Sequence, residues 1–314
     1  MHPLSTHLRS TFGFGLSIAG AFALAPSAAA QSATPSSTPA GPTMASIVAA
    51  TTAADWRALD PENSLYLELA TGRVVIELAP AFAPLHVANV KALVREKYFD
   101  GLTINRAQDN YVVQWGDGDA DDKDKRRPIR AAKATLPAEF DRGFAADLPF
   151  TRSPDGDIYA PESGWSQGFP VARDLKSGRA WMIHCYGTLG AGRGNTADSG
   201  GGTELFVVIG HSPRHLDRND TVFGRVVKGI EHLSTLPRGA GPLGFYEKAE
   251  QRVPIKSLRL AASVPAAERT AVEVLRTDTA AFSSLIEARR TRREEWFKNP
   301  AGRIEVTNVP IPAR

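Results

Sequence analysis

Short segments of alternating apolar and polar residues, separated by turns, constrain the fold of this 314-residue chain more than any other feature. Residues 65–69 (LYLEL) alternate in this way, and the alternation predicts a strand because successive strand residues point to opposite faces of a sheet. Further strands are predicted at residues 73–78, 111–113, 205–209, 222–227 and 253–260. Only one or two helices are predicted among them, the clearest beginning at Pro84. Many strands with few helices favour a closed or sandwiched antiparallel sheet.

Two long segments depart from this pattern. Residues 118–178 are rich in Asp, Lys, Arg, Pro and Gly, and we predict a long loop insertion there because the prolines discourage regular helix. Residues 263–314 are predicted to be a helical C-terminal extension, since apolar residues between 282 and 288 recur at helical spacing. The main folded part is therefore predicted to span residues 55–262 and to contain the insertion.

The N-terminus has the features of a targeting segment. A positive charge at Arg9, an apolar run over residues 11–25 and the small residues 28–30 predict a secretory signal peptide at 1–30. A membrane anchor is the alternative, but the run is short for a bilayer span, and we predict no membrane span in the mature chain. Residues 31–54 are predicted to be a flexible linker. With a single cysteine, Cys185, the chain can form no internal disulfide, which favours a periplasmic location.

Composition and the simpler motifs argue against several functions. Lys plus Arg total 37 against 34 acidic residues, so nothing indicates the clustered basic face of a nucleic-acid-binding protein. The glycines at 187–194 lack the strand before and the helix after that a dinucleotide-binding loop needs. Asp117, Asp119 and Asp121 have calcium-loop spacing, but Asp122 replaces the glycine required at the sixth position. The sequence therefore predicts no metal and no cofactor.

Two stretches carry a more specific signal. Residues 98–117 read YFDGLTINRAQDNYVVQWGD, and residues 203–227 read TELFVVIGHSPRHLDRNDTVFGRVV. Together they resemble the cyclophilin family of peptidyl-prolyl cis–trans isomerases. The matching positions are Tyr98, Gly101, Arg106, Gln114, Gly116, Asp117, Phe206, Leu216, Asp217, Val222, Phe223, Gly224, Val226 and Gly229. The resemblance covers roughly residues 65–260, and it implies a mainly β fold in which helices cap an eight-stranded antiparallel barrel.

The same resemblance implies a site. Arg106 falls on the family's catalytic arginine, and the other site residues fall on positions that bind the peptide. Those that match, or replace one apolar or aromatic residue by another, are Tyr111, Val112, Gln114, Phe206 and Leu216. Those that depart from the family's pattern are His184, Glu204, His215 and Asp220, which stand where the family has Asn, Gln, Trp and His.

The chemistry of proline isomerisation accounts for these residue types. Rotation about a peptide bond faces a barrier of about 18–20 kcal/mol from amide resonance, and no bond is broken. A guanidinium can donate to the amide nitrogen only when the twisted transition state has regained a lone pair, so it stabilises that state selectively. The sequence therefore predicts an isomerase for proline-containing exported polypeptides. The alternative is a binding module or chaperone on the same fold with little or no turnover, which the four departures support.

Overall fold

The structure is a computed structural model that describes residues 41–144 and 148–314. The signal peptide predicted at 1–30 and the first part of the predicted linker lie outside the described residues. The described residues belong to one compact unit. Within them, no helix is long and apolar enough to cross a membrane.

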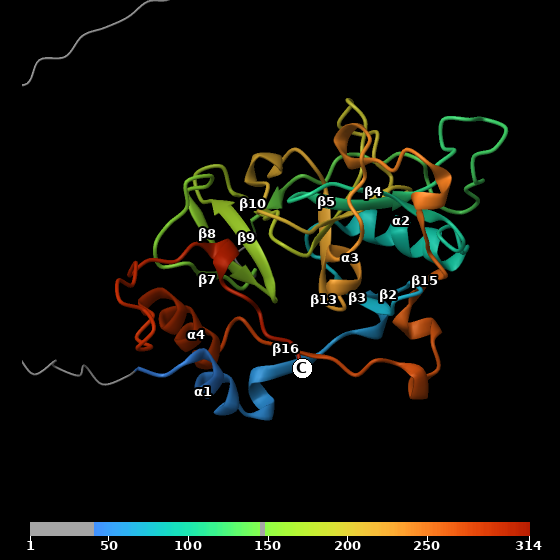
Figure 1. The fold of residues 1–314 in the computed structure, drawn as a ribbon. Helices are drawn as coiled ribbons and strands as arrows, with labels where there is room; N and C mark the ends of the chain where they lie inside the picture. The colour runs from blue at the N-terminus through green and yellow to red at the C-terminus, as the bar shows by residue number, and fades with distance from the viewer. Residues whose placement is uncertain (1–40, 145–147) are drawn as a thin grey trace, which may run out of the picture. The chain divides into compact units, whose positions relative to one another are not determined.

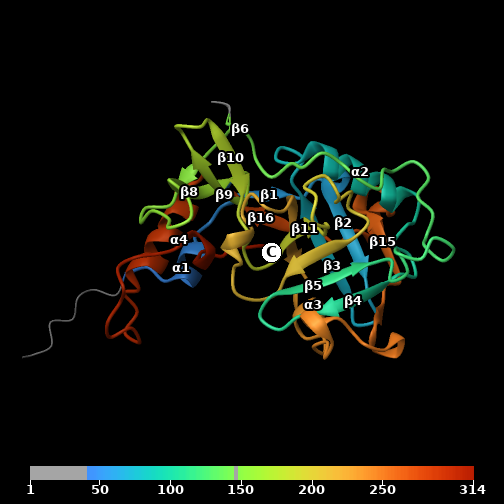
Figure 2. The ribbon, with the colours of Figure 1, turned by 90° about the horizontal axis from the view of Figure 1, so that it is seen from above.

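A curled antiparallel sheet forms the larger part of the molecule (Figures 1 and 2). In spatial order its strands are β14 (Val253–Pro254), β4 (Thr103–Ala107), β5 (Val112–Gly116), β12 (Leu205–Val208), β11 (Thr188–Ala191), β13 (Val222–Lys228), β3 (Arg73–Leu78), β2 (Ser64–Glu68) and β15 (Ser257–Leu260). The two edge strands, β14 and β15, are consecutive in the chain. Between them Ile255 N donates to Leu102 O (2.8 Å) and Lys256 N donates to Glu68 O (2.9 Å). One segment thus borders both edges, and the nine-stranded sheet has the predicted eight strands when β14 and β15 are counted as one.

Helix α2 (Pro84–Arg95) covers this sheet on one side (Figure 2). Its proline occupies the first turn, where the missing N–H leaves no hydrogen bond unmade. Val87, Val90 and Leu93 recur at helical spacing and are buried with the strand residues of the sheet. The helix ends before Lys97, whose φ of 59° is left-handed. A short helix, α3 (Glu231–Ser234), follows β13.

The insertion forms a second sheet where the sequence predicted a long loop. Its strands run in the order β6 (Arg142–Gly143), β10 (Arg179–Met182), β9 (Phe169–Asp174), β8 (Glu162–Ser166) and β7 (Thr151–Arg152). The prediction was wrong because these strands are short and carry residues that usually interrupt strands. At Gly164 in β8, a Cβ atom would lie 2.2 Å from the carbonyl oxygen of Thr151, so only glycine allows β7 to approach.

The first and last described segments of the chain meet beside the inserted sheet. Helices α1 (Met44–Ala49) and α4 (Ala280–Thr291) lie side by side (Figures 1 and 2), and β1 (Trp56–Ala58) pairs with β16 (Glu273–Leu275). Residues 44–54 therefore do not form the expected flexible linker, because Ile47 buries its side chain with those of Phe282 and Leu285. The C-terminal extension is helical only in part. Single 3-10 turns complete the chain at Ala53–Asp55, Pro61–Asn63, Arg214–Leu216, Pro242–Gly244, Ala249–Gln251, Ala261–Ser263, Ala266–Glu268 and Val306–Asn308.

Among the described residues, four apolar clusters hold these parts together, and the smallest contains Tyr66, Val75, Ala261 and Val264. One fills the curled sheet, and a second joins α1, α4 and the inserted sheet, where Trp165 meets Phe282 edge to face at 5.3 Å. The third joins the large sheet to the inserted sheet, and its members include Val112, Phe206, Val208, Phe169, Val171 and Met182. Because two predicted site residues belong to this third cluster, the inserted sheet packs directly against the candidate site.

Candidate functional site

Arg106 lies on β4, opposite Gln114 of β5. The register of the two strands shifts between Ile104 and Arg106, a bulge of the kind that re-aims a side chain. The guanidinium donates three hydrogen bonds: Nε to Leu243 O (2.7 Å), Nη1 to Gln114 Oε1 (3.0 Å) and Nη2 to Gln108 Oε1. A guanidinium has five N–H groups, so two remain for a ligand.

Aromatic rings flank the same guanidinium. Its central carbon lies 5.5 Å from the ring centroid of Tyr111 and 5.5 Å from that of Phe245. Burial lowers the pKa of Arg106, but an arginine remains protonated at any physiological pH. Burial also disfavours the charged form of Tyr111 and so raises its pKa. The site therefore presents a fixed, half-buried cation between two rings.

The hydrogen bonds continue from Arg106 and Gln114 to a buried carboxyl group, and these three side chains are called the polar row below. Gln114 Nε2 donates to Glu204 Oε2 at 2.6 Å. Burial raises the pKa of Glu204, and the hydrogen bond from Gln114 offsets this only in part. Gly192 leaves room for the row, since a Cβ there would lie 3.2 Å from Glu204 Cβ. Arg106 of β4, Gln114 of β5 and Glu204, which directly precedes β12, thus form one hydrogen-bonded series.

The predicted apolar slot is covered. Phe206 is 5% exposed and Val112 is 3% exposed, and both pack with the inserted sheet. The ring of Phe206 lies against Gly190, where a Cβ would come within 2.3 Å of it. On another side His184 stacks on Phe206, with the centroids 6.2 Å apart and the planes 5° apart. Tyr111 packs against the same cluster and so borders both the apolar and the polar parts of the site.

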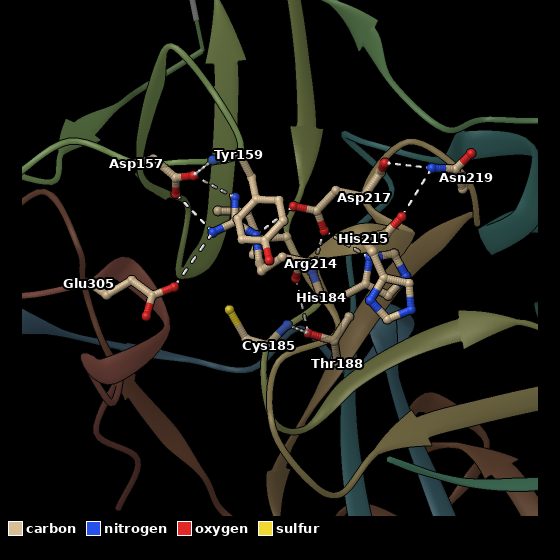
Figure 3. Close-up of polar contacts among 11 residues, drawn as sticks. Asp157, Tyr159, His184, Cys185, Thr188, Arg214, His215, Asp217, Asn219 and Glu305 are labelled. Atoms are coloured by element: carbon tan, nitrogen blue, oxygen red, sulfur yellow. Dashed lines mark hydrogen bonds and ion pairs between the residues drawn. The ribbon is translucent and has the colours of Figure 1, made fainter. Parts of the chain in front are cut away.

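A buried ionic network extends from His184 to the inserted sheet (Figure 3). The backbone N and ring Nδ1 of His184 both lie 3.0 Å from Asp217 Oδ1. The other oxygen of Asp217 accepts from Arg214 Nε at 2.6 Å. The Nη1 and Nη2 atoms of Arg214 donate to the two oxygens of Asp157, at 2.8 and 3.1 Å. Since Asp157 belongs to the insertion and Phe206 to the large sheet, this network fixes the two sheets relative to each other.

The remaining predicted site residues lie on the loop that carries Arg214. Leu216 is half-buried at the end of a 3-10 turn, and His215 on the same turn is exposed. His215 lines a cavity with residues of the inserted sheet, which Arg106 does not line. Asp220 Oδ1 lies 3.7 Å from Arg193 Nε. The structure therefore brings Arg106, Tyr111, Gln114 and Glu204 together and sets Val112, Phe206 and His184 beside them.

Sequence reasoning missed several neighbours of these residues. Leu243 follows Arg106 by 137 positions, so no local pattern could connect them. Arg193 was also missed, although it contacts Asp220 and lies with its guanidinium carbon 5.5 Å from the ring centroid of Phe140. Arg193 follows β11 by two residues, and in the Gly-rich stretch around it a single arginine carried no distinguishing signal.

Asp220 should make stability depend on pH. Burial raises its pKa from 3.8 to about 6, while the charges of His184 and Arg193 act in the opposite direction. The protonated form is therefore favoured in the folded state, and its contribution to stability is present below about pH 4 and is lost as the pH rises through about 6. The difference between the two pKa values corresponds to roughly 3 kcal/mol at most. Urea unfolding measured from pH 4 to pH 7 should show a smaller loss over this range in Asp220→Asn than in the unmodified chain, and equal slopes would contradict the assignment.

The curled antiparallel sheet carries Arg106 and Gln114 on adjacent strands beside the buried Phe206. This arrangement is the one expected of a prolyl isomerase. Residues 64–260 match the family model for cyclophilin-type peptidyl-prolyl cis–trans isomerases, and the chain belongs to this family of enzymes.

Individual proteins agree with this assignment. A probable peptidyl-prolyl cis-trans isomerase of Brucella suis is 29% identical over 191 residues, covering 58% of this chain and 76% of that protein. Peptidyl-prolyl cis-trans isomerase B of Bacillus subtilis is 26% identical over 168 residues, or 53% of this chain and 85% of that protein. The crystal structure of the cyclophilin AquaCyp293 from Hirschia baltica superposes with a TM-score of 0.68 at 26% identity, covering 87% of this chain and 97% of that one. That match is too long to be confined to residues 64–260.

Proposed function

We propose that this chain accelerates rotation about X-Pro bonds of exported polypeptides and that Arg106 is its catalytic residue. The observation that supports the proposal most directly is the guanidinium of Arg106, which is held by three acceptors and still has two N–H groups to donate. Neighbouring apolar residues, Tyr111 among them, supply the surface on which a pyrrolidine ring can rest.

The proposed mechanism needs no nucleophile and no proton transfer. As the amide twists, its nitrogen becomes pyramidal and gains a lone pair, to which an N–H of Arg106 donates. Because the guanidinium is already oriented by Gln114, Gln108 and Leu243, little reorganisation is needed when that lone pair appears. The hydrogen bond forms only near the transition state and so lowers the barrier rather than merely tightening binding.

The burial of Phe206 and Val112 favours a second candidate function. In the described structure the inserted sheet and His184 cover both side chains, so a pyrrolidine ring can reach the phenylalanine only if these neighbours shift. A chain with this arrangement could bind proline-containing segments on the surface around Tyr111 without turning them over. This is the binding-module alternative.

One pair of assays separates the two functions. Isomerisation of a short Ala-Pro peptide and proline-limited refolding of an unfolded protein are measured with the same preparation, and binding of a labelled proline peptide is measured alongside. Rate acceleration in either assay supports the isomerase. Binding without acceleration in both assays supports the binding module, and neither binding nor acceleration would overturn both proposals.

The periplasmic location is a prediction with its own test. Expressed with its full sequence in a Gram-negative host, the protein should be recovered from the periplasmic fraction, with an N-terminus at Gln31 because small residues precede that position. N-terminal sequencing of the fractionated protein checks this. Full-length protein that retains Met1 in the cytosolic fraction would contradict it.

A further inference from the structure

A cavity of about 680 Å³ lies between the inserted sheet and the loop that follows β12. The insertion contributes Asp141 and Tyr159 to its lining, β10 contributes Trp181, and the loop contributes His215 and Arg218. Figure 3 shows Tyr159 from the insertion facing Arg214 and Asp217 of this loop. The cavity exists because the inserted sheet stands beside the barrel, so a barrel alone would not form it.

Two independent series of contacts connect this cavity with the candidate site. In the first, Asp217 lines the cavity and holds His184, which stacks on Phe206. In the second, Phe140 lines the cavity beneath Arg193, which pairs with Asp220. Through these contacts the cavity lies beside His184 and Asp220 of the candidate site.

The arginines of the lining differ in how fully they are compensated. Arg214 is 2% exposed and pairs with three carboxylates, Asp157, Asp217 and, at 3.9 Å, Glu305, so it has a structural role. Arg179 and Arg218 are 41% and 51% exposed, and they share the single carboxylate of Asp141. Their Nη1 atoms have no hydrogen-bond partner among residues 41–144 and 148–314. Two accessible guanidinium groups thus share one carboxylate, whose two oxygens each already accept a hydrogen bond from one of them.

Other groups at the cavity define what else a ligand would meet. The guanidinium carbon of Arg218 lies 5.0 Å from the ring centroid of Trp181, which restricts its position. Asp174, the remaining carboxylate of the lining, accepts from Lys176 N at 2.9 Å within its own turn. Asn219 donates its side-chain amide to backbone carbonyls of the loop. The N–H groups that can still donate to an anion are therefore concentrated at Arg179 and Arg218.

We infer that this cavity is an accessory subsite for the polypeptide substrate, where Arg179 and Arg218 bind an acidic segment that flanks the proline. This inference rests on the proposed function, because it assigns the substrate segment and its chemistry to the same site. The carboxylate of a substrate Glu or Asp would accept from the unpartnered N–H groups of both arginines. The inserted sheet would then select among proline-containing chains while Arg106 acts on the bond.

The experiment uses the full chain and three labelled peptides that share one central Ala-Pro bond. A segment on one side of that bond is acidic, basic or serine-rich. The variants are Arg179→Gln and Arg218→Gln, and either one leaves Asp141 paired with the other arginine, so the fold is retained. Lys176→Gln is the matched control, since it removes one exposed positive charge from the inserted sheet outside the cavity lining. Affinity is measured by fluorescence anisotropy at low and high salt, and the isomerisation rate of a short Ala-Pro peptide is measured in parallel.

The expected result is tighter binding of the acidic peptide than of the serine-rich one by roughly three- to tenfold at low salt, with a smaller difference at high salt. Each cavity variant should reduce that preference several-fold, whereas Lys176→Gln and the rate on the short peptide should stay unchanged. Equal affinity for all three peptides, a preference for the basic peptide at Asp174, or a preference that survives in both cavity variants would overturn the inference. If no isomerisation is found at all, the anisotropy data still decide whether the subsite exists.

Discussion

Replacing Arg106 with alanine should lower kcat/KM for isomerisation of a short Ala-Pro peptide by about 10²–10³, while the Kd for the same peptide changes little. The loss corresponds to removal of one preorganised donor to a developing lone pair, which is typically worth about 2.7–4 kcal/mol. Ground-state binding depends instead on the apolar surface that includes Tyr111 and on backbone hydrogen bonds. Isomerisation kinetics and fluorescence anisotropy, measured on one preparation, separate the effect on turnover from the effect on binding.

A neighbouring arginine provides the control for that experiment. Arg238 pairs with the exposed Asp109 at 3.1 Å and donates to Leu236 O and Ser234 O, and within residues 41–144 and 148–314 it makes no hydrogen bond or ion pair with a candidate site residue. Arg238→Ala should therefore retain nearly full activity.

Phe206→Ala should weaken binding as well as turnover, because it removes a buried ring against which His184 and the inserted sheet pack. If Arg106→Ala keeps its activity in an otherwise active enzyme, another group must stabilise the twisted amide.

Removing Arg214 should produce the largest loss of stability. Burial alone would lower the pKa of this arginine, but its hydrogen bonds to Asp157 and its proximity to Asp217 more than offset burial and raise the pKa. Arg214→Leu would leave these two carboxylates buried without a counter-charge, which typically costs about 3–5 kcal/mol. The free energy of unfolding in urea is the measurement.

An exposed ion pair gives the comparison. Arg276 pairs with Asp278 at 2.9 Å on the surface, and Arg276→Leu should cost much less stability than Arg214→Leu because water screens an exposed ion pair. Asp157→Asn combined with Arg214→Leu should recover part of the loss, because one of the two uncompensated charges is removed with the arginine. A loss in Arg214→Leu no greater than that in Arg276→Leu would show that water reaches the network.

The barrel was predictable because its signals are local. Alternation over residues 65–69 indicates β2, and the short run of apolar, β-branched residues at 73–78 indicates β3, although both faces of these strands are largely buried. Arg106 and Gln114 are close in the sequence and lie on adjacent antiparallel strands, so a spacing pattern could place them together. The contact of Gln114 with Glu204, 90 positions later, carried no such local signal.

The surroundings of the site depend on contacts between distant segments. Nothing in the sequence near Asp157 shows that it meets Arg214, 57 positions later. The inserted strands escaped prediction because Gly164 and Pro170 are residues that usually interrupt a strand, and here each lies within one. As a result, the covering of Phe206 and the cavity beside it could be found only in the folded chain.

The pairing of β2 with β15 sets the order in which this protein can fold. Leu65 lies opposite Leu260, so β2, near the start of the chain, cannot pair along this edge until residue 260 is available. A chain that emerges N-terminus first, from a ribosome or a secretion channel, leaves the edge of β2 unpaired for most of its synthesis or passage. Such long-range closure slows folding. The sheet therefore cannot close at β2 until residues 257–260 have emerged.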